Sequence, residues 1–224
     1  TPLKPAQRSA RCFTPSAASA SRQGRSARSL TKMQTAAAPS AADAVKFVRS
    51  SSEFCPYYTL RTLKNVKVGP SPEWLRRDLE AAGLRPINNV VDITNYVMID
   101  LGRPLHAYDV DKIAGNTLTV RMAYEGEEIL ALNEKTYICG PEMLVIGDAD
   151  GADDLAGIMG GERSGVRDTT TRMFLEIAIF DPISVATTGR KLNINSDARY
   201  RFERGLDITS PQTMAGYIAR LVMS

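Results

Sequence analysis

Hydrophobic and polar positions alternate over several segments between residues 58 and 180, a pattern that predicts half-buried β-strands. The segments with this pattern or with a short apolar run are 58–68, 117–123, 128–132, 135–139, 143–146 and 174–180. The turn Asn133-Glu134 lies between two of them and indicates a β-hairpin. Helices are predicted at 71–83, 88–102 and 181–191 and from Ser210 onward. Because strands outnumber helices and do not alternate with them, we expect an α+β fold, with mostly antiparallel or mixed sheets packed with several short helices.

The first predicted helix has a defined start and end. Ser71 is the expected N-cap, Pro72 occupies the first helical position, and Gly83 ends the helix. Trp74 and Leu75 belong to its predicted buried face. At this position we expect the indole of Trp74 to be a core group rather than a platform for stacking.

The segment Leu84–Asp109 combines a short apolar helix with an unusual number of hydrogen-bonding side chains. Asn88 or Asn89 can cap this helix, and Gly102 can end it. By periodicity alone, Thr94 and Asn95 belong to the exposed face of the helix.

The same segment contains the only histidine of the chain, His106. Arg103-Pro104 predicts an extended exit from the helix that delivers His106 and Asp109 on a turn. The pair could take part in acid–base chemistry, although a lone histidine is more often structural. Cys139 could serve as a nucleophile, but nothing in the sequence brings it near His106.

Glu176 interrupts the most apolar strand, Phe174–Phe180. A carboxylate among apolar neighbours must either be paired or face a cavity, because burying a lone charge is costly. The alternative is simple strand alternation, with Glu176 on the solvent face beside Ala178 and Phe180. If it is buried at the bottom of a pocket, it would select strongly for a ligand hydroxyl group.

The glycine-rich segment 155–161 contains Gly157, Gly160 and Gly161 but matches neither a Walker sequence nor a dinucleotide-binding turn. Glycines in a strand context mark either a bulge or the close approach of a ligand to the backbone. A second polar cluster, Arg199, Arg201 and Arg204, could bind phosphates. The interleaved Glu203 makes an internal salt-bridge network an equally good interpretation.

Composition narrows the class of protein. Residues 1–42 contain seven basic residues and no acidic one in an Ala/Ser-rich background, which predicts disorder. The segment is a solvated tail, a cloning or translation artefact, or an organellar transit peptide. We divide the chain into this tail at 1–43, a single compact domain at 44–207, and a C-terminal helix or linker at 208–224. A net charge of +3 does not by itself argue for nucleic acid, and no apolar run is long enough for a transmembrane helix.

The three cysteines are far apart and predict reduced thiols rather than a disulfide framework or a zinc site. With one histidine, no metal site is expected. We expect a cytoplasmic protein, or an organellar one if the tail is a transit peptide.

Four motifs in the same order resemble the central editing region of bacterial-type phenylalanyl-tRNA synthetase β subunits. They are RPINNVVDITNYVMIDLGRPLHAYD, AGIMGGERSGV, FLEIAIFDP and SDARYRFERGLD, and the resemblance extends from about Pro56 to about Asp207. Because family β subunits are several times longer, the chain resembles one internal module of such a subunit.

The resemblance implies that the chain hydrolyses tyrosine mischarged onto tRNA(Phe). The catalytic group implied by the family motifs holds the amino acid and the hydrolytic water, and consists of His106, Asn95 and Thr94. The implied substrate-binding residues are Glu176, which recognises the tyrosine hydroxyl, together with Gly157, Gly160, Ser196 and Ala198. Arg85 matches a position that contacts the tRNA end, where a cation can hold a phosphate.

The implied mechanism uses a positioned water and no protein nucleophile, because an aminoacyl ester is already activated. The implied partners are the 3′ end of tRNA(Phe) and an α subunit, with no membrane and no DNA. No cofactor is expected in this chain, since the ATP and magnesium of the synthetic reaction are expected on the α subunit. A non-catalytic module that binds the tRNA end or docks a subunit is the alternative from a different functional class.

Overall fold

The computed structural model describes residues 46–49, 53–209 and 211–223 of the chain. The strands are β1 (Lys46–Arg49), β2 (Tyr57–Lys64), β3 (His106–Asp109), β4 (Thr117–Met122), β5 (Glu127–Leu130), β6 (Thr136–Cys139), β7 (Leu144–Asp148), β8 (Gly151–Leu155) and β9 (Arg172–Ile179). The helices are α2 (Glu73–Ala81), α3 (Asn89–Leu101), α4 (Pro182–Lys191), α5 (Asp197–Phe202) and α6 (Pro211–Met223), with the short 3₁₀ helices η2 (Val110–Lys112) and η3 (Ala114–Asn116).

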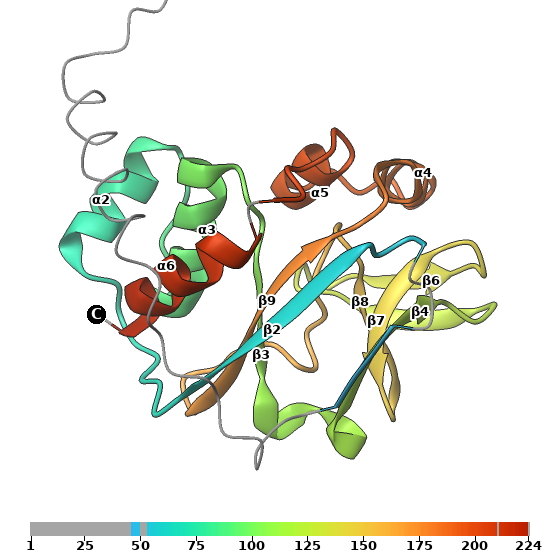
Figure 1. Cartoon of the computed structure of the whole chain (residues 1–224), viewed down its shortest axis with the longest axis horizontal. Coiled ribbons are helices and arrows are strands. Elements are labelled where there is room, and N and C mark those ends of the chain that lie inside the picture. The colour runs from blue at the N-terminus through green and yellow to red at the C-terminus, as the bar shows by residue number, and fades with distance from the viewer. Residues whose placement is uncertain (1–45, 50–52, 210, 224) are drawn as a thin grey trace, which may run out of the picture. The chain divides into compact units, whose positions relative to one another are not determined.

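The described strands form three sheets, with the orders β1-β4-β7-β8, β2-β9-β3 and β5-β6. Among these strands β1 and β4 pair in parallel, and every other pairing is antiparallel. In Figure 1, helices α2, α3 and α6 gather on one side of the β2-β9-β3 sheet, and the larger sheet lies on the other side. The predicted α+β class is confirmed.

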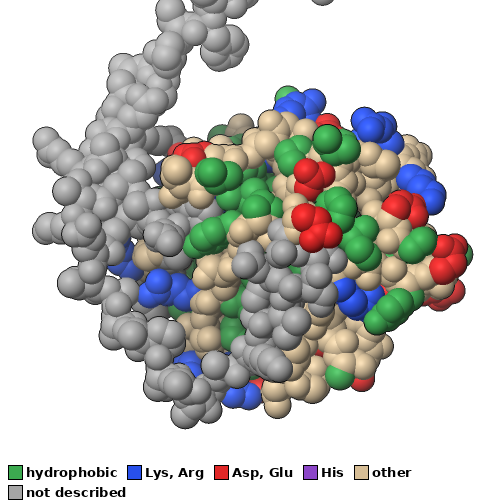
Figure 2. All heavy atoms as spheres, turned by 45° about the vertical axis from the view of Figure 1, so that its right-hand side comes forward, with side chains coloured by type: hydrophobic (Ala, Val, Ile, Leu, Met, Phe, Trp, Pro, Cys, Tyr) green, Lys and Arg blue, Asp and Glu red, His purple; other side chains and the backbone are tan. Residues whose placement is uncertain are grey.

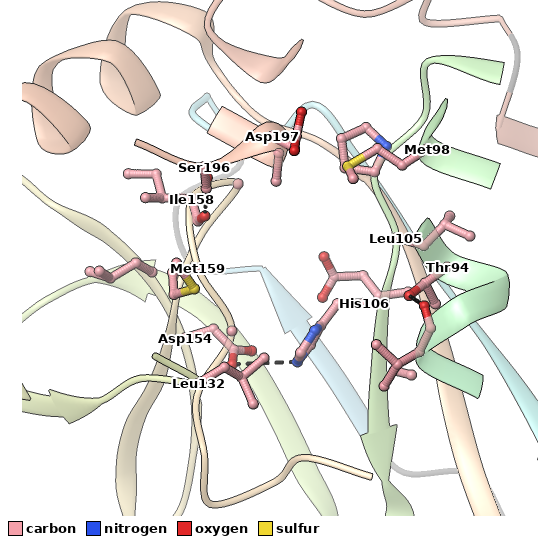
Figure 3. Close-up of a pocket in the computed structure, with 18 of the residues that line it drawn as sticks. Thr94, Met98, Leu105, His106, Leu132, Asp154, Ile158, Met159, Ser196 and Asp197 are labelled. Carbon is pink, nitrogen blue, oxygen red and sulfur yellow. Dashed lines mark hydrogen bonds and ion pairs between the residues drawn. The ribbon is translucent and has the colours of Figure 1, made fainter. Parts of the chain in front are cut away.

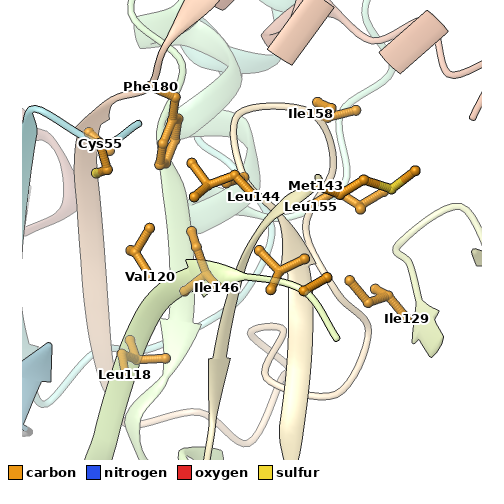
Figure 4. Close-up of a cluster of buried hydrophobic side chains, with 14 of the residues drawn as sticks. Cys55, Leu118, Val120, Ile129, Met143, Leu144, Ile146, Leu155, Ile158 and Phe180 are labelled. Carbon is orange, nitrogen blue, oxygen red and sulfur yellow. The ribbon is translucent and has the colours of Figure 1, made fainter. Parts of the chain in front are cut away.

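Strand β9 is buried on both faces because each face contacts a different hydrophobic core. Met173, Leu175 and Ile177 point toward the helices α2, α3 and α6. Phe174 and Ala178 alternate with them and point into the core shared with the larger sheet. Figure 4 shows part of this second core, including residues of the larger sheet and Phe180 at the end of β9. Double burial explains why the segment reads as a nearly continuous apolar run.

Side-chain caps set the starts of three helices, and the local sequence predicts two of these starts. Asn88 accepts a hydrogen bond from the Val91 amide at the start of α3, and Asp181 accepts one from the Ser184 amide at the start of α4. Gly102 ends α3 in the left-handed conformation with φ +68°. Ser196 caps α5, a helix that the sequence pattern had not predicted.

The start of α2 differs from its prediction. The Ser71 hydroxyl does not cap the helix but donates a hydrogen bond of 2.5 Å to the buried carboxylate of Asp92 on α3, and Pro72 takes the N-cap position. The prediction that Trp74 is a core residue is also wrong. Trp74 is 38% exposed and meets the ring of Tyr96 edge to face. The side chain therefore covers the α2–α3 contact from outside.

The remaining strand predictions are right in place and approximate in length. The 128–139 hairpin is present as β5 and β6, whereas β2 ends at Lys64 rather than at residue 68, and β8 had not been predicted. The predicted tail, Cys12 and Ser210 lie outside the described residues.

On the face shown in Figure 2, acidic, basic and hydrophobic side chains are interspersed. No helix within the described ranges is long and apolar enough to span a bilayer.

Candidate functional site

Strand pairing brings the candidate polar residues together. His106 on β3 lies directly opposite Glu176 on β9, so their side chains share one face of the sheet. Tyr108 lies two residues after His106 on that face, and Tyr58 occupies the corresponding face of β2. The predicted position of His106 on a turn is therefore wrong, since the residue begins a strand of the central sheet.

A cavity of about 340 Å³ opens over this face. Its walls come from α3, from β3 and β9, from the 154–160 segment and from the start of α5. Figure 3 shows Thr94 and Leu105 on one side and Asp154, Ile158 and Met159 on the other, with Ser196 and Asp197 across one end. A volume of this size falls within the range of about 300–1,000 Å³ typical of small-molecule sites.

Eight of the nine predicted site residues line this cavity: Thr94, Asn95, His106, Gly157, Gly160, Glu176, Ser196 and Ala198. Periodicity placed Thr94 and Asn95 on the exposed face of the helix. That prediction is wrong, because both residues are half-buried and line the cavity. The ninth residue, Arg85, is exposed and follows Leu84, which does line the cavity.

Glu176 is buried, with 6% of its surface exposed, so the solvent-face alternative is wrong. Its Oε2 atom accepts hydrogen bonds of 2.7 Å from the hydroxyl groups of both Tyr58 and Tyr108. Burial raises the pKa of Glu176, while His106 and the two phenol groups act in the opposite direction. Both bonds accepted from described residues reach Oε2, which leaves Oε1 for a ligand.

Asp154 is a further polar residue of the cavity that the sequence reasoning missed. Its carboxyl group contacts the hydroxyl of Tyr108, and its Oδ1 accepts a hydrogen bond of 2.5 Å from the amide of Gly161. Burial raises the pKa of Asp154 to about 7, although the nearby His106 opposes the shift. The pair Asp153-Asp154 next to an apolar segment was the available sequence signal.

The imidazole of His106 lies between these two acids. Its Nε2 is 3.6 Å from Oδ1 of Asp154 and, although buried, has no hydrogen-bond partner among the described residues. Its ring meets Tyr108 edge to face at 4.5 Å between centroids. Asp109 instead accepts hydrogen bonds from the Thr170 hydroxyl and the Asp111 amide, so the predicted His106–Asp109 pair does not form.

The two predicted glycines make room for different groups. A Cβ atom at Gly160 would lie 2.3 Å from Cε1 of His106. A Cβ atom at Gly157 would lie 2.8 Å from Phe180, and the residue has a φ of +71° that favours glycine. Gly160 thus lets the histidine approach the loop, and Gly157 permits a tight turn over the core.

Ser196 joins the glycine-rich segment to α5. Its hydroxyl donates a hydrogen bond of 2.6 Å to the carbonyl of Ile158 and accepts one from the Arg199 amide. The neighbouring arginines are paired as the salt-bridge interpretation predicted. Their carboxylate partners lie at 2.8–3.1 Å, in the pairs Arg199–Glu203, Arg201–Asp197 and Arg204–Glu203.

Cys139 does not belong to the cavity. It is buried at the end of β6, and burial raises the pKa of its thiol to about 11. A thiol in this state is a poor nucleophile. Within the described part of the chain, no group of three or more histidine, cysteine or acidic residues is arranged to hold a metal ion.

Comparison with known proteins relates the chain to one family. The model of the B3/4 domain matches residues 54–224. The phenylalanine–tRNA ligase β subunit of Mesorhizobium japonicum is 53% identical over 163 residues, which cover 73% of this chain and 20% of that protein. The β subunit of Rhodopseudomonas palustris is 54% identical over 156 residues, or 70% of this chain and 19% of that protein.

The chain thus spans about a fifth of the length of these relatives. A solved N-terminal fragment of the phenylalanyl-tRNA synthetase β subunit from Pyrococcus horikoshii aligns with a TM-score of 0.46 and 12% identity, over 69% of this chain and 49% of that one. Since the family model covers more than half of the sequence, the chain belongs to the B3/4 domain family, and its resemblance to phenylalanyl-tRNA synthetase β subunits is confirmed.

Proposed function

We propose that the chain is the editing module of a phenylalanine–tRNA ligase β subunit and hydrolyses the ester between tyrosine and tRNA(Phe). The observation that carries the proposal is the buried carboxylate of Glu176 inside a cavity lined mainly by apolar groups. The relatives named as β subunits of this ligase support the choice of tRNA.

Glu176 provides the selectivity in this proposal. Its Oε1 accepts a hydrogen bond from the para-hydroxyl of tyrosine, while Oε2 is held by Tyr58 and Tyr108. A phenylalanine ring in the same place would remove water from Oε1 and offer no hydrogen bond in return. Leaving a buried charged acceptor unpaired costs about 1–3 kcal/mol or more, which disfavours phenylalanine.

The hydrolytic step needs a positioned water rather than a protein nucleophile. His106, Asn95 and Thr94 line the cavity and hold the ester and the attacking water. The Thr94 hydroxyl donates to the Val91 carbonyl at 2.7 Å, which fixes its oxygen as an acceptor. His106 borders the place of the ester with its imidazole ring, whose buried Nε2 has no hydrogen-bond partner among the described residues. An already activated ester gains most from such positioning.

Arg85 serves the tRNA end. It is exposed, forms no ion pair with another described residue, and follows a residue of the cavity wall. A guanidinium group in this position can hold a backbone phosphate of the 3′ terminus. The α subunit is the proposed partner, and we assign the ATP and magnesium of aminoacyl-tRNA synthesis to it.

The test is the deacylation of tyrosyl-tRNA(Phe) and phenylalanyl-tRNA(Phe) by the chain and by Glu176→Gln. We expect the unmutated chain to clear the tyrosyl ester faster. In Glu176→Gln the amide keeps the shape of the side chain but not its charge. We therefore expect the ratio of kcat/KM for the tyrosyl ester to kcat/KM for the phenylalanyl ester to fall by about 10- to 100-fold, which corresponds to the loss of one charged hydrogen bond.

Glu128→Gln is the matched control, because Glu128 is an exposed glutamate of β5 outside the cavity. Its ratio should equal that of the unmutated chain. Equal clearance of both esters by the unmutated chain would contradict the proposed selectivity. Saturable tRNA binding without any ester turnover would favour the non-catalytic module instead.

A further inference from the structure

One phenol bridges two acids in the cavity. The hydroxyl of Tyr108 contacts both Oδ2 of Asp154 and Oε2 of Glu176, and Tyr58 contacts the same Oε2. These three oxygen–oxygen contacts require three protons, and the two phenol groups supply two. Since an ionised carboxylate only accepts hydrogen bonds, the third proton must reside on one of the two acids.

The hydrogen-bond geometry places this proton on Asp154. Oε2 of Glu176 already faces two hydroxyl groups, so it is best satisfied as an acceptor of both. Oδ1 of Asp154 accepts from the Gly161 amide, which leaves Oδ2 to carry a proton toward Tyr108. The resulting chain of donors runs from Asp154 to Tyr108 to Glu176.

We propose that Asp154 is a specificity-determining residue: it donates a hydrogen bond to Tyr108, so that the Tyr108 hydroxyl donates to Glu176 beside that of Tyr58, and Glu176 remains an ionised acceptor whose Oε1 can bind a ligand hydroxyl. This inference rests on the proposed function, in which Glu176 reads that hydroxyl. When Asp154 loses its proton to solvent, both carboxylates are ionised and compete for the single proton of Tyr108, and Glu176 loses one of its two donors whenever Tyr108 donates to Asp154. Discrimination between hydroxylated and plain aromatic rings then weakens as pH rises.

The groups around Asp154 support a proton there. His106 and Tyr108 face it from β3, Glu176 from β9 and Tyr58 from β2, with the acidic neighbour Asp153 on its own strand. Burial raises the pKa of Asp154 to about 7, the charges of Asp153 and Glu176 act in the same direction, and His106 opposes them. The titration therefore falls in an accessible range of pH.

The first experiment locates the proton without any ligand. Carboxyl ¹³C NMR of the ligand-free chain, with Asp154→Asn to assign the resonance, should show Asp154 titrating near pH 7. Tyr108→Phe should shift that midpoint, because it removes the acceptor of the proton. An Asp154 midpoint near the ordinary value of about 4 would overturn the inference.

The second experiment measures selectivity by binding, which does not require hydrolysis. The affinities for tyrosine amide and phenylalanine amide are measured at several pH values between 6 and 8.5, and their ratio is taken at each pH. Because both ligands carry the same amino group, its titration cancels in this ratio. We expect the preference for tyrosine amide to fall on the order of tenfold over this range, equivalent to one hydrogen bond. In Asp154→Asn the side-chain amide donates to Tyr108 at every pH, so the preference should stay high and flat.

Asp150→Asn is the control, since Asp150 is an exposed acid of the β7–β8 turn, and it should follow the unmutated curve. A flat unmutated curve, an Asp154→Asn curve that falls with pH, or no preference for tyrosine amide would each overturn the inference. If binding behaves as expected while no ester is hydrolysed, the role of Asp154 in recognition stands and the hydrolytic function fails.

Discussion

Gly157 and Gly160 lie three residues apart in one segment, yet an added methyl group meets different surroundings at each. At Gly160 it meets His106, whose side chain is 21% exposed and has room to move. At Gly157 it meets the closely packed Phe180 under an unfavourable φ. Residue type alone did not distinguish these two roles, because both depend on what packs against the loop.

We expect Gly160→Ala to impair the reaction more than it impairs folding. The imidazole must move away from residue 160 and out of its present position, so kcat for ester hydrolysis should fall at least about tenfold, as happens when a positioned group is displaced. Gly157→Ala should instead lower the free energy of unfolding by about 1–3 kcal/mol through strain. Tm values and single-turnover deacylation rates measure both effects.

Gly69→Ala is the control, because no atom lies within 4 Å of the added methyl group and φ is not positive. A Gly160→Ala variant with unchanged kcat would contradict the idea that this glycine makes room for the histidine.

Among the elements, α3 and β9 position the site. Helix α3 supplies Thr94 and Asn95 to one wall of the cavity, and β9 supplies Glu176. The helix is fixed at its start by the Asn88 cap and is held through Asp92, which accepts hydrogen bonds from the Ser71 hydroxyl and the Ile87 amide. The position of this wall therefore depends on local caps as much as on packing.

Replacing the cap residue of α3 with alanine should destabilise the fold, whereas replacing it with aspartate should not. Asn88→Ala leaves the Val91 amide without its partner and should lower the free energy of unfolding by about 1 kcal/mol. Asn88→Asp retains the acceptor and should be close to neutral. Chemical denaturation of the three proteins measures the difference, and equal losses for both variants would contradict the capping role.

For the whole molecule, the two acids of the cavity make the free energy of unfolding depend on pH. The pKa of Asp154 is raised from 3.8 to about 7, so its contribution to stability is complete below about pH 4 and is lost as pH rises through 7. Glu176, with a raised pKa, acts in the same direction. Glu127, whose pKa is lowered from 4.5 to about 2 mainly by its hydrogen bond with Arg121, acts in the opposite direction: its contribution is complete above about pH 4.5 and is lost as pH falls through 2.

Asp154→Asn should therefore gain stability relative to the unmutated chain as the solution becomes more basic. Between pH 5 and 7 the difference in free energy of unfolding should grow by up to about 1.4 kcal/mol per pH unit, because the asparagine cannot ionise. Above pH 8 the difference should level off. Thermal unfolding at several pH values checks this expectation, and a difference that is constant with pH would contradict the raised pKa of Asp154.

The sequence alone determined the α+β class, most strands, the helix start at Asp181 and, as one of two adjacent candidates, the helix start at Asn88. These features depend on alternation over a few residues and on caps within one turn, which are local properties. The motifs further indicated eight residues that the structure brings to one cavity. Glu176 was recognisable as exceptional because a charge among apolar neighbours requires an explanation.

Only the tertiary structure decided which way Glu176 faces, because β9 is covered on both sides and alternation no longer separates buried from exposed positions. The tertiary structure also decided the contacts of Ser71, whose hydroxyl donates to Asp92 on another helix, and the position of Trp74 outside the core. Asp154 contacts Tyr108, which lies 46 positions earlier in the chain, and approaches the imidazole of His106, which lies 48 positions earlier. Such contacts arise from strand register and layer packing, which no local pattern encodes.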